Sequence, residues 1–97
     1  MKREEFIFTI GYEGDTAIVD GHALKQFKQL STMELFEKGL FKAAFSSAIY
    51  SGDEGEIGRL IEAYNELRAT KYSSSDDIKR LFGIQIVSAE FEKVEII

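Results

Sequence analysis

The fold of this chain is decided by residues 31–50, STMELFEKGLFKAAFSSAIY, its longest apolar segment with helical spacing. Ser31 and Glu34 have the S-x-x-E spacing of a capping box, in which each side chain accepts a hydrogen bond from the backbone N–H of the other residue. The pattern therefore predicts a helix that starts at Thr32.

Two rows of apolar residues follow at helical spacing. They are Met33, Phe36, Leu40, Ala44 and Ala48 in the first row, and Phe41, Phe45 and Ile49 in the second. Only Lys38, Lys42 and Ser46 form a polar strip, which is expected to face solvent. A helix with so wide an apolar surface must be covered on more than one side, which predicts that it lies at the centre of the core. The aromatic residues are read as part of that core and not as a cofactor pocket.

Gly39 leaves two interpretations of this segment open. It is either an interior glycine that lets another backbone come close, or the C′ residue that ends a short helix at Lys38. In the second case Leu40 would contact Leu35, as in a Schellman cap. The predicted core position of the segment is the same in both.

Composition indicates one soluble globular domain spanning residues 1–97, with 44% hydrophobic and 30% charged residues. The absence of cysteine excludes a disulfide framework, a thiolate metal site and a thiol nucleophile. A net charge of −5 disfavours binding to a polyanion, so no nucleic-acid partner is expected. No signal-peptide-like or membrane-spanning apolar run is seen, and the expected location is cytoplasmic with no membrane partner.

Residues 4–10 and 16–20 are rich in β-forming residues and are separated by Gly11-Tyr-Glu-Gly-Asp15, which predicts a hairpin with Glu13 and Gly14 as its turn. In that register Ile10 faces Ala17 and Phe8 faces Val19. One face of the hairpin then carries Phe6, Phe8, Ile10, Ala17 and Val19, to be covered by helices, and the reverse face carries Ile7, Thr9 and Ile18. The apolar Ile7 and Ile18 on a face open to solvent indicate a partner surface.

Three further helices are predicted from caps and apolar spacing: residues 21–30 after Asp20, residues 54–69 after Asp53, and residues 76–82 after Ser74 or Ser75 and before Gly83.

The last segment, residues 84–97, is rich in β-forming residues. Its apolar side chains alternate with polar ones, but they change from one face of the strand to the other along the segment, which is typical of a bulge or bend. We expect it to join the hairpin beside residues 4–10. A straight strand of that length would be longer than the strands of the hairpin. The part of it that extends beyond the hairpin would have an unpaired edge, which could pair with another chain. The residues that would contact a partner there are Phe91, Val94 and Ile96.

Candidate chemical residues are few. His22 is the only histidine, and the local sequence supplies neither a nucleophile nor a second ligand for it. Asp53, Glu54 and Glu56 do not match the spacing of a calcium loop and are explained by helix capping, so no metal site and no cofactor are expected. Tyr12 lies at the predicted hairpin tip, where an aromatic residue suits a contact surface.

The predicted fold is α+β: a small antiparallel sheet, made of an N-terminal hairpin and the C-terminal strand, with three to four helices on one face. The leading functional hypothesis is a small cytoplasmic protein-interaction or regulatory module that acts by binding and is a homodimer, through the sheet edge or the exposed sheet face.

Two alternatives stay open. One is a small-ligand-binding protein or enzyme with a pocket near the hairpin end, built from Tyr12, Glu13, Asp15 and His22, although no catalytic constellation is apparent. The other is nucleic-acid binding, for which residues 54–82 could be read as a helix-turn-helix. Asp76 and Asp77 at the start of the second helix would face phosphates and oppose that reading.

Overall fold

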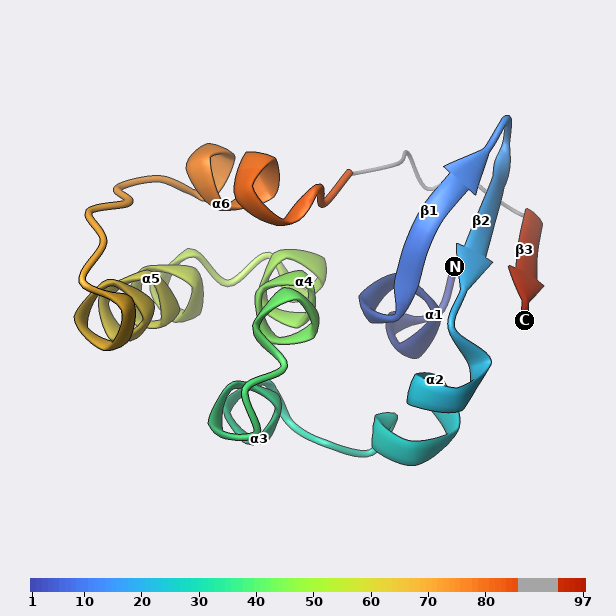
Figure 1. Cartoon of the computed structure of the whole chain (residues 1–97), viewed down its shortest axis with the longest axis horizontal. Helices are drawn as coiled ribbons and strands as arrows, with labels where there is room; N and C mark the ends of the chain where they lie inside the picture. The colour runs from blue at the N-terminus through green and yellow to red at the C-terminus, as the bar shows by residue number, and fades with distance from the viewer. Residues whose placement is uncertain (86–92) are drawn as a thin grey trace.

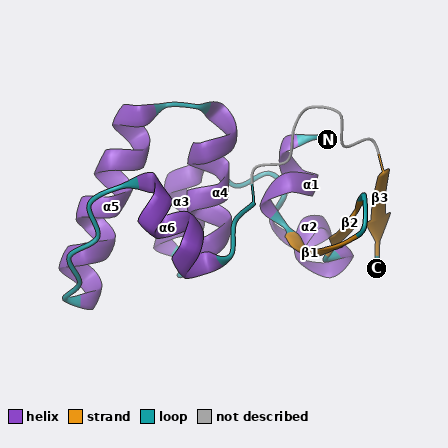
Figure 2. Ribbon diagram, turned by 90° about the horizontal axis from the view of Figure 1, so that it is seen from above, coloured by secondary structure: helices purple, strands orange, loops and turns teal. Residues whose placement is uncertain are grey.

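The computed structural model describes residues 1–85 and 93–97 (Figure 1). The helices are α1 (Arg3–Ile7), α2 (Gly21–Phe27), α3 (Thr32–Glu37), α4 (Phe41–Ser51), α5 (Glu54–Arg68) and α6 (Ser75–Phe82), and the strands are β1 (Thr9–Glu13), β2 (Thr16–Val19) and β3 (Lys93–Ile96). The molecule measures 36 × 25 × 20 Å along its principal axes. The sheet lies at one end with α1 and α2, and α5 and α6 lie at the other (Figure 2). The α+β class is confirmed.

The central segment is two helices, α3 and α4, separated at Gly39. The backbone N–H of Gly39 donates to Phe36 O at 2.9 Å, and that of Leu40 donates to Leu35 O at 3.0 Å. These are the two hydrogen bonds of a Schellman cap, and Gly39 has the left-handed φ of 80° that the cap requires. The second of the two interpretations of Gly39 is therefore the correct one. The capping box of Ser31 and Glu34 is also present.

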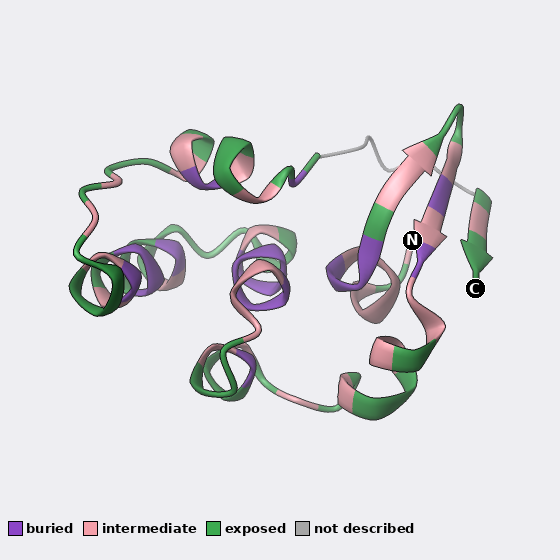
Figure 3. Ribbon diagram, viewed as in Figure 1, coloured by how far each residue is buried: buried purple, intermediate pink, exposed green. Residues whose placement is uncertain are grey.

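Helix α4 contributes to both hydrophobic clusters of the described chain. Ala43 and Ala44 belong to a cluster with Ile7, Phe8, Val19 and Leu35 on the sheet side. Phe45 and Ala48 belong to a second cluster, formed with residues of α5, α6 and the start of the last segment: Ile57, Leu60, Ile61, Tyr64, Ile78 and Ile84. Buried residues are accordingly concentrated on the helices around α4 and on β2 (Figure 3). The prediction that this segment is enclosed by its neighbours is confirmed.

Two residues of the central segment lie in environments that differ from the predicted ones. Ser46, expected in a solvated strip, is only 2% exposed, and Met33, expected in an apolar row, is 47% exposed. The break at Gly39 changes the helix direction, so Met33 no longer lies in line with the buried face of α4. Ser46 is buried because that side of α4 faces β1 and not solvent.

The N-terminal strand predicted at residues 4–10 is wrong, because residues 3–7 form helix α1. Phe6, Ile7 and Phe8 are three consecutive apolar residues, and a helical turn lets Phe6 pack against both clusters while Ile7 and Phe8 enter the sheet-side one. Glu5 accepts a hydrogen bond from the backbone N–H of Lys2 at 2.8 Å, which supports the helix start. Arg3 then ties α1 to the rest of the fold, since its Nη2 donates to Ser47 Oγ at 2.8 Å and to Leu30 O at 3.0 Å.

The hairpin is consequently shifted along the chain, and its turn residues are Gly14 and Asp15 instead of Glu13 and Gly14. The observed antiparallel pairs are Thr9 with Val19, Gly11 with Ile18, Tyr12 with Ala17, and Glu13 with Thr16. The pairs predicted for Phe8 and Ile10 are therefore wrong. Ile10 falls at an irregularity between Thr9 and Gly11, where it lies opposite no residue of β2 and is 56% exposed.

The C-terminal strand joins the sheet on the opposite edge from the one expected. The strand order is β1-β2-β3, and β3 runs parallel to β2, with Ala17 opposite Val94 and Val19 opposite Ile96. The sheet is thus mixed and not antiparallel. A parallel neighbour requires a long crossover, which α2 to α6 supply. Residues 83–85 lie on the β1 side of the sheet, where they line a hollow together with residues of β1. The predicted change of phase falls on residues outside the described ranges.

The remaining helix predictions are confirmed, with the expected caps. Asp20, Asp53 and Ser74 accept hydrogen bonds from the first turns of α2, α5 and α6, and Gly83 ends α6 in the left-handed conformation. The described residues contain six helices where three to four were predicted, and α5 and α6 pack on α4 and not on the sheet. None of these helices is both long and apolar enough to cross a membrane.

Candidate functional site

The outer edge of β3 has no strand partner among the described residues. On its inner side the backbone N–H of Ile97 donates to Val19 O at 3.0 Å, and Ile97 O accepts from the N–H of Gly21 at 3.1 Å. Because successive residues of a strand direct their backbone groups to opposite sides, the N–H and C=O groups of Val94 and Ile96 are directed outward. Among the described residues, no strand pairs with that side (Figure 1).

The side chains of β3 divide between the two faces of the sheet. Val94 lies beside Ala17 and packs partly buried against the sheet-side cluster, whereas Lys93 and Glu95 are exposed on the other face. Ile96 and Ile97 are 55% and 67% exposed at the end of the strand. The edge therefore combines backbone groups that no described strand pairs with and apolar side chains that are largely exposed, two properties that favour pairing with another strand.

Lys93 also links β3 to the hairpin turn. Its Nζ lies 3.1 Å from Asp15 Oδ2, and the hydrogen bond and positive charge of Lys93 lower the pKa of the Asp15 carboxyl. Both side chains are 69% exposed, so the pair contributes little to stability. The pair joins the start of β3 to the hairpin turn.

The predicted partner surface on the reverse face of the sheet is reduced to one residue. Ile7 is 2% exposed and belongs to the core, so its assignment to that surface is wrong, and Thr9 is buried as well. Ile18 is partly exposed and lies between Gly11, which has no side chain, and the charged Glu95. Phe91 lies outside the described residues. Val94 and Ile96 thus carry the candidate surface.

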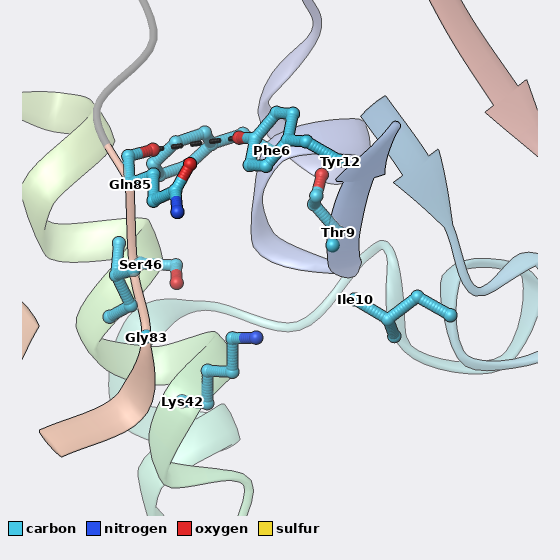
Figure 4. A pocket seen from close by; sticks show the side chains of 10 residues that line it. Phe6, Thr9, Ile10, Tyr12, Lys42, Ser46, Gly83 and Gln85 are labelled. Atoms are coloured by element: carbon cyan, nitrogen blue, oxygen red, sulfur yellow. Dashed lines mark hydrogen bonds between the residues drawn. The ribbon is translucent and has the colours of Figure 1, made fainter. Parts of the chain in front are cut away.

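The four residues proposed for a pocket near the hairpin end do not share one. Glu13 and Asp15 are exposed around the turn, and His22 is exposed in the first turn of α2, beyond the opposite end of β2. Tyr12 points instead toward the residues that follow α6, and its hydroxyl donates a long hydrogen bond of 3.5 Å to Gln85 O (Figure 4). Burial raises the pKa of the Tyr12 hydroxyl. Of the four side chains, only that of Tyr12 lines a described pocket.

Two neighbouring hollows are lined by residues of β1 and of the N-terminal half of α4. The smaller, of about 20 Å³, is lined by polar residues, among them Thr9, Lys42 and Ser46, and by apolar residues such as Phe6 and Ile84. The larger is a groove of about 360 Å³ with mainly apolar walls, among them Ile10, Phe27, Leu40 and Phe41. Thr9, Ile10 and Lys42 line both hollows. This arrangement could not be predicted from the sequence, because the spacing of polar residues shows one side of α4 but not which element covers that side.

No cluster of three or more potential metal ligands is present in the part of the chain that the structure describes. No protein-family model matches the chain, and no curated protein or solved structure is similar enough to count as a match. The candidate sites are therefore interpreted from their own geometry.

Proposed function

We propose that the chain is a small cytoplasmic interaction module that acts by binding and forms a homodimer through its β3 edges. The observation that carries the proposal is the outward direction of the backbone groups of Val94 and Ile96 at an edge with exposed isoleucines. A strand of a second copy added there would satisfy these groups and join two three-stranded sheets into one.

The sequence of β3 favours one register for this pairing. In an antiparallel pair about a two-fold axis, residues with outward backbone groups must lie opposite one another. Centring the axis on Val94 meets this condition and sets Lys93 of each copy opposite Glu95 of the other. Opposite charges directly across an antiparallel pair are favourable, whereas centring the axis on Glu95 would bring two like charges together.

The two alternatives have less support. An enzyme or ligand-binding role at the hairpin end needs Tyr12, Glu13, Asp15 and His22 to converge, and they are spread over different parts of the surface. Nucleic-acid binding needs a basic surface, and the chain carries a net charge of −5.

Sedimentation equilibrium at tens of micromolar tests the dimer. The wild-type mass is expected to be twice that of one chain. Val94→Pro removes an outward N–H and leaves the inward bonds of β3 intact, because proline is tolerated at an edge position whose N–H faces out. This variant should be monomeric, with a dimer dissociation constant raised at least about tenfold, the effect of losing roughly 1.4 kcal/mol.

Val94→Ala is the matched control, because it also shortens the side chain but keeps the N–H, and it should remain dimeric. Charge reversal tests the register: Glu95→Lys should weaken the dimer, and adding Lys93→Glu to the same chain should restore it. A wild-type mass of one chain, or a Val94→Pro variant that stays dimeric, would refute the proposal.

A further inference from the structure

The end of β3 lies against the start of α2, with no space for a side chain at Gly21. The backbone N–H of Gly21 donates to Ile97 O at 3.1 Å. A Cβ added at Gly21 would lie 2.5 Å from that same oxygen and 2.8 Å from Cγ2 of Ile96, and both distances are shorter than real Cβ atoms show. Any larger residue at this position therefore requires the end of the strand to move.

The backbone of Gly21 does not itself require a glycine. Its φ is negative, so a residue with a side chain could adopt the same conformation. Gly21 is the first residue of α2, and alanine is a better helix former than glycine. The cap of α2 is made by the side chain of Asp20, which accepts from the N–H of Ala23. The close approach of β3 is therefore what requires glycine here.

Few other contacts hold β3 in place. Lys93, Glu95 and Ile96 are exposed, and Val94 is only partly buried. The ion pair between Lys93 and Asp15 is exposed and contributes little. Among the described residues, β3 pairs with β2 alone (Figure 1). An element with so few buried contacts can open locally while the rest of the fold stays intact.

We propose that Gly21 is a positioning residue for the dimer. In this proposal β3 docks on β2 and leaves it as one unit, and the docked state depends on the fit of Ile96 and Ile97 over Gly21. The inference rests on the proposed function, since the strand that docks is the one whose outer edge would pair with a second copy. Docking holds the outward backbone groups of Val94 and Ile96 in one row. An undocked segment has no such row, and ordering it during pairing costs conformational entropy.

Docking and dimerisation then favour each other, because two coupled equilibria stabilise one another by the same factor. A second copy paired with β3 holds the strand on β2, and a change that undocks β3 weakens the dimer. Gly21 bonds to the inner side of β3, away from the pairing edge. Its effect on the dimer therefore passes through the position of β3.

Gly21→Ala tests the inference in the full chain, by amide hydrogen exchange measured with NMR at low protein concentration. The N–H of Ile97 donates to Val19 O at 3.0 Å and should exchange at least about tenfold faster in the variant. The N–H of Leu24, which bonds to Asp20 O within α2, and the protected amides of α4 should exchange no faster. Those amides report that α2 and the core are intact. In sedimentation equilibrium, the dimer dissociation constant of the variant should rise at least about tenfold.

Gly11→Ala is the matched control. Gly11 lies in β1, at the other edge of the same sheet, its φ is also negative, and an added Cβ would meet nothing within 4 Å. This variant should leave both the exchange of the Ile97 N–H and the dimer dissociation constant unchanged.

Ile97→Pro tests the same contact from the side of the strand. It removes the N–H that donates to Val19 O and leaves Gly21 as it is. The strand-like ¹³Cα shifts of residues 93–96 should move toward random-coil values, and the dimer should weaken.

Exchange of the Ile97 N–H that is as slow in Gly21→Ala as in the wild type would overturn the inference. Faster exchange without a weaker dimer would overturn the link between docking and pairing. A wild type that is monomeric at every concentration refutes the proposed dimer, whereas faster exchange in Gly21→Ala would still support the role of Gly21 in docking β3. The two failures are therefore distinguishable.

Discussion

Gly39 determines where the central segment breaks. It has a φ of 80°, and a side chain added at its Cα would meet nothing within 4 Å. Gly39→Ala should therefore destabilise the fold through backbone conformation alone, by about 1–2 kcal/mol. Urea unfolding measures the change.

Gly58 is the matched control for this substitution. It lies exposed within α5, where an added Cβ also has open space, but its backbone is helical. Gly58→Ala should stabilise the protein by about 0.5–1 kcal/mol, because alanine loses less backbone entropy in a helix than glycine does. If the two substitutions changed the stability in the same direction, the Schellman cap at Gly39 would be contradicted.

At the scale of single elements, α6 is held at its start by Asp77. The carboxylate accepts hydrogen bonds from the N–H and the hydroxyl of Ser73 at 3.2 and 3.3 Å. These bonds lower the pKa of Asp77 below its ordinary value of 3.8, with the backbone N–H of Ser73 as the largest cause. A lowered pKa in the folded state adds stability above the unfolded-state pKa, and that stability is lost as the pH falls through the folded-state value.

Asp77→Asn should therefore be less stable than the wild type at pH 7, and the difference should shrink as the pH falls below about 3.8. Thermal unfolding followed by circular dichroism at pH 7, 5, 4 and 3 measures the trend. The helical signal at pH 7 serves as the control that both proteins are folded. A difference that stays constant down to pH 3 would contradict the role assigned to the Asp77 charge.

Helix starts and ends were predictable because their signals are local. Ser31, Asp53 and Gly83 each act on backbone groups within four residues, and all three act as their sequence context indicates. Helix α1 was missed because Phe6-Ile7-Phe8 is apolar without a gap, which matches neither the helical nor the strand period. Glu4 and Glu5, which lie in the first turn of α1, were the available helix signal.

Features that depend on distant partners could not be read from the sequence. The pairing of β3 with β2 depends on which edge the intervening helices leave open, and a β-rich pattern carries no information about that. The same holds for Lys42 and Ser46, because the spacing of residues shows that they share one side of α4 but not which element lies against that side. The assignment of Val94 and Ile96 to a partner surface rests on the length and apolar content of the last segment and stays a prediction.

At the scale of the whole molecule, α4 joins the two hydrophobic clusters into one folding unit. Neighbouring residues of α4, Ala44 and Phe45, are both fully buried but face different clusters. Phe6 and Phe36 pack against both clusters as well. A loss of packing on one side of α4 should therefore weaken the other side too.

Phe45→Leu tests this coupling. The ring of Phe45 stacks on Phe82 with centroids 5.6 Å apart and meets Tyr64 edge-on at 5.8 Å, so its replacement should cost about 1–2 kcal/mol. Native-state hydrogen exchange should then be roughly 5- to 30-fold faster for the most protected amides of both α6 and β2. Leu81→Ala, on an exposed position of α6, is the control and should leave the exchange of β2 unchanged. Faster exchange in α5 and α6 alone would mean that the two clusters unfold separately, and that α4 does not couple the β3 edge to the helical end.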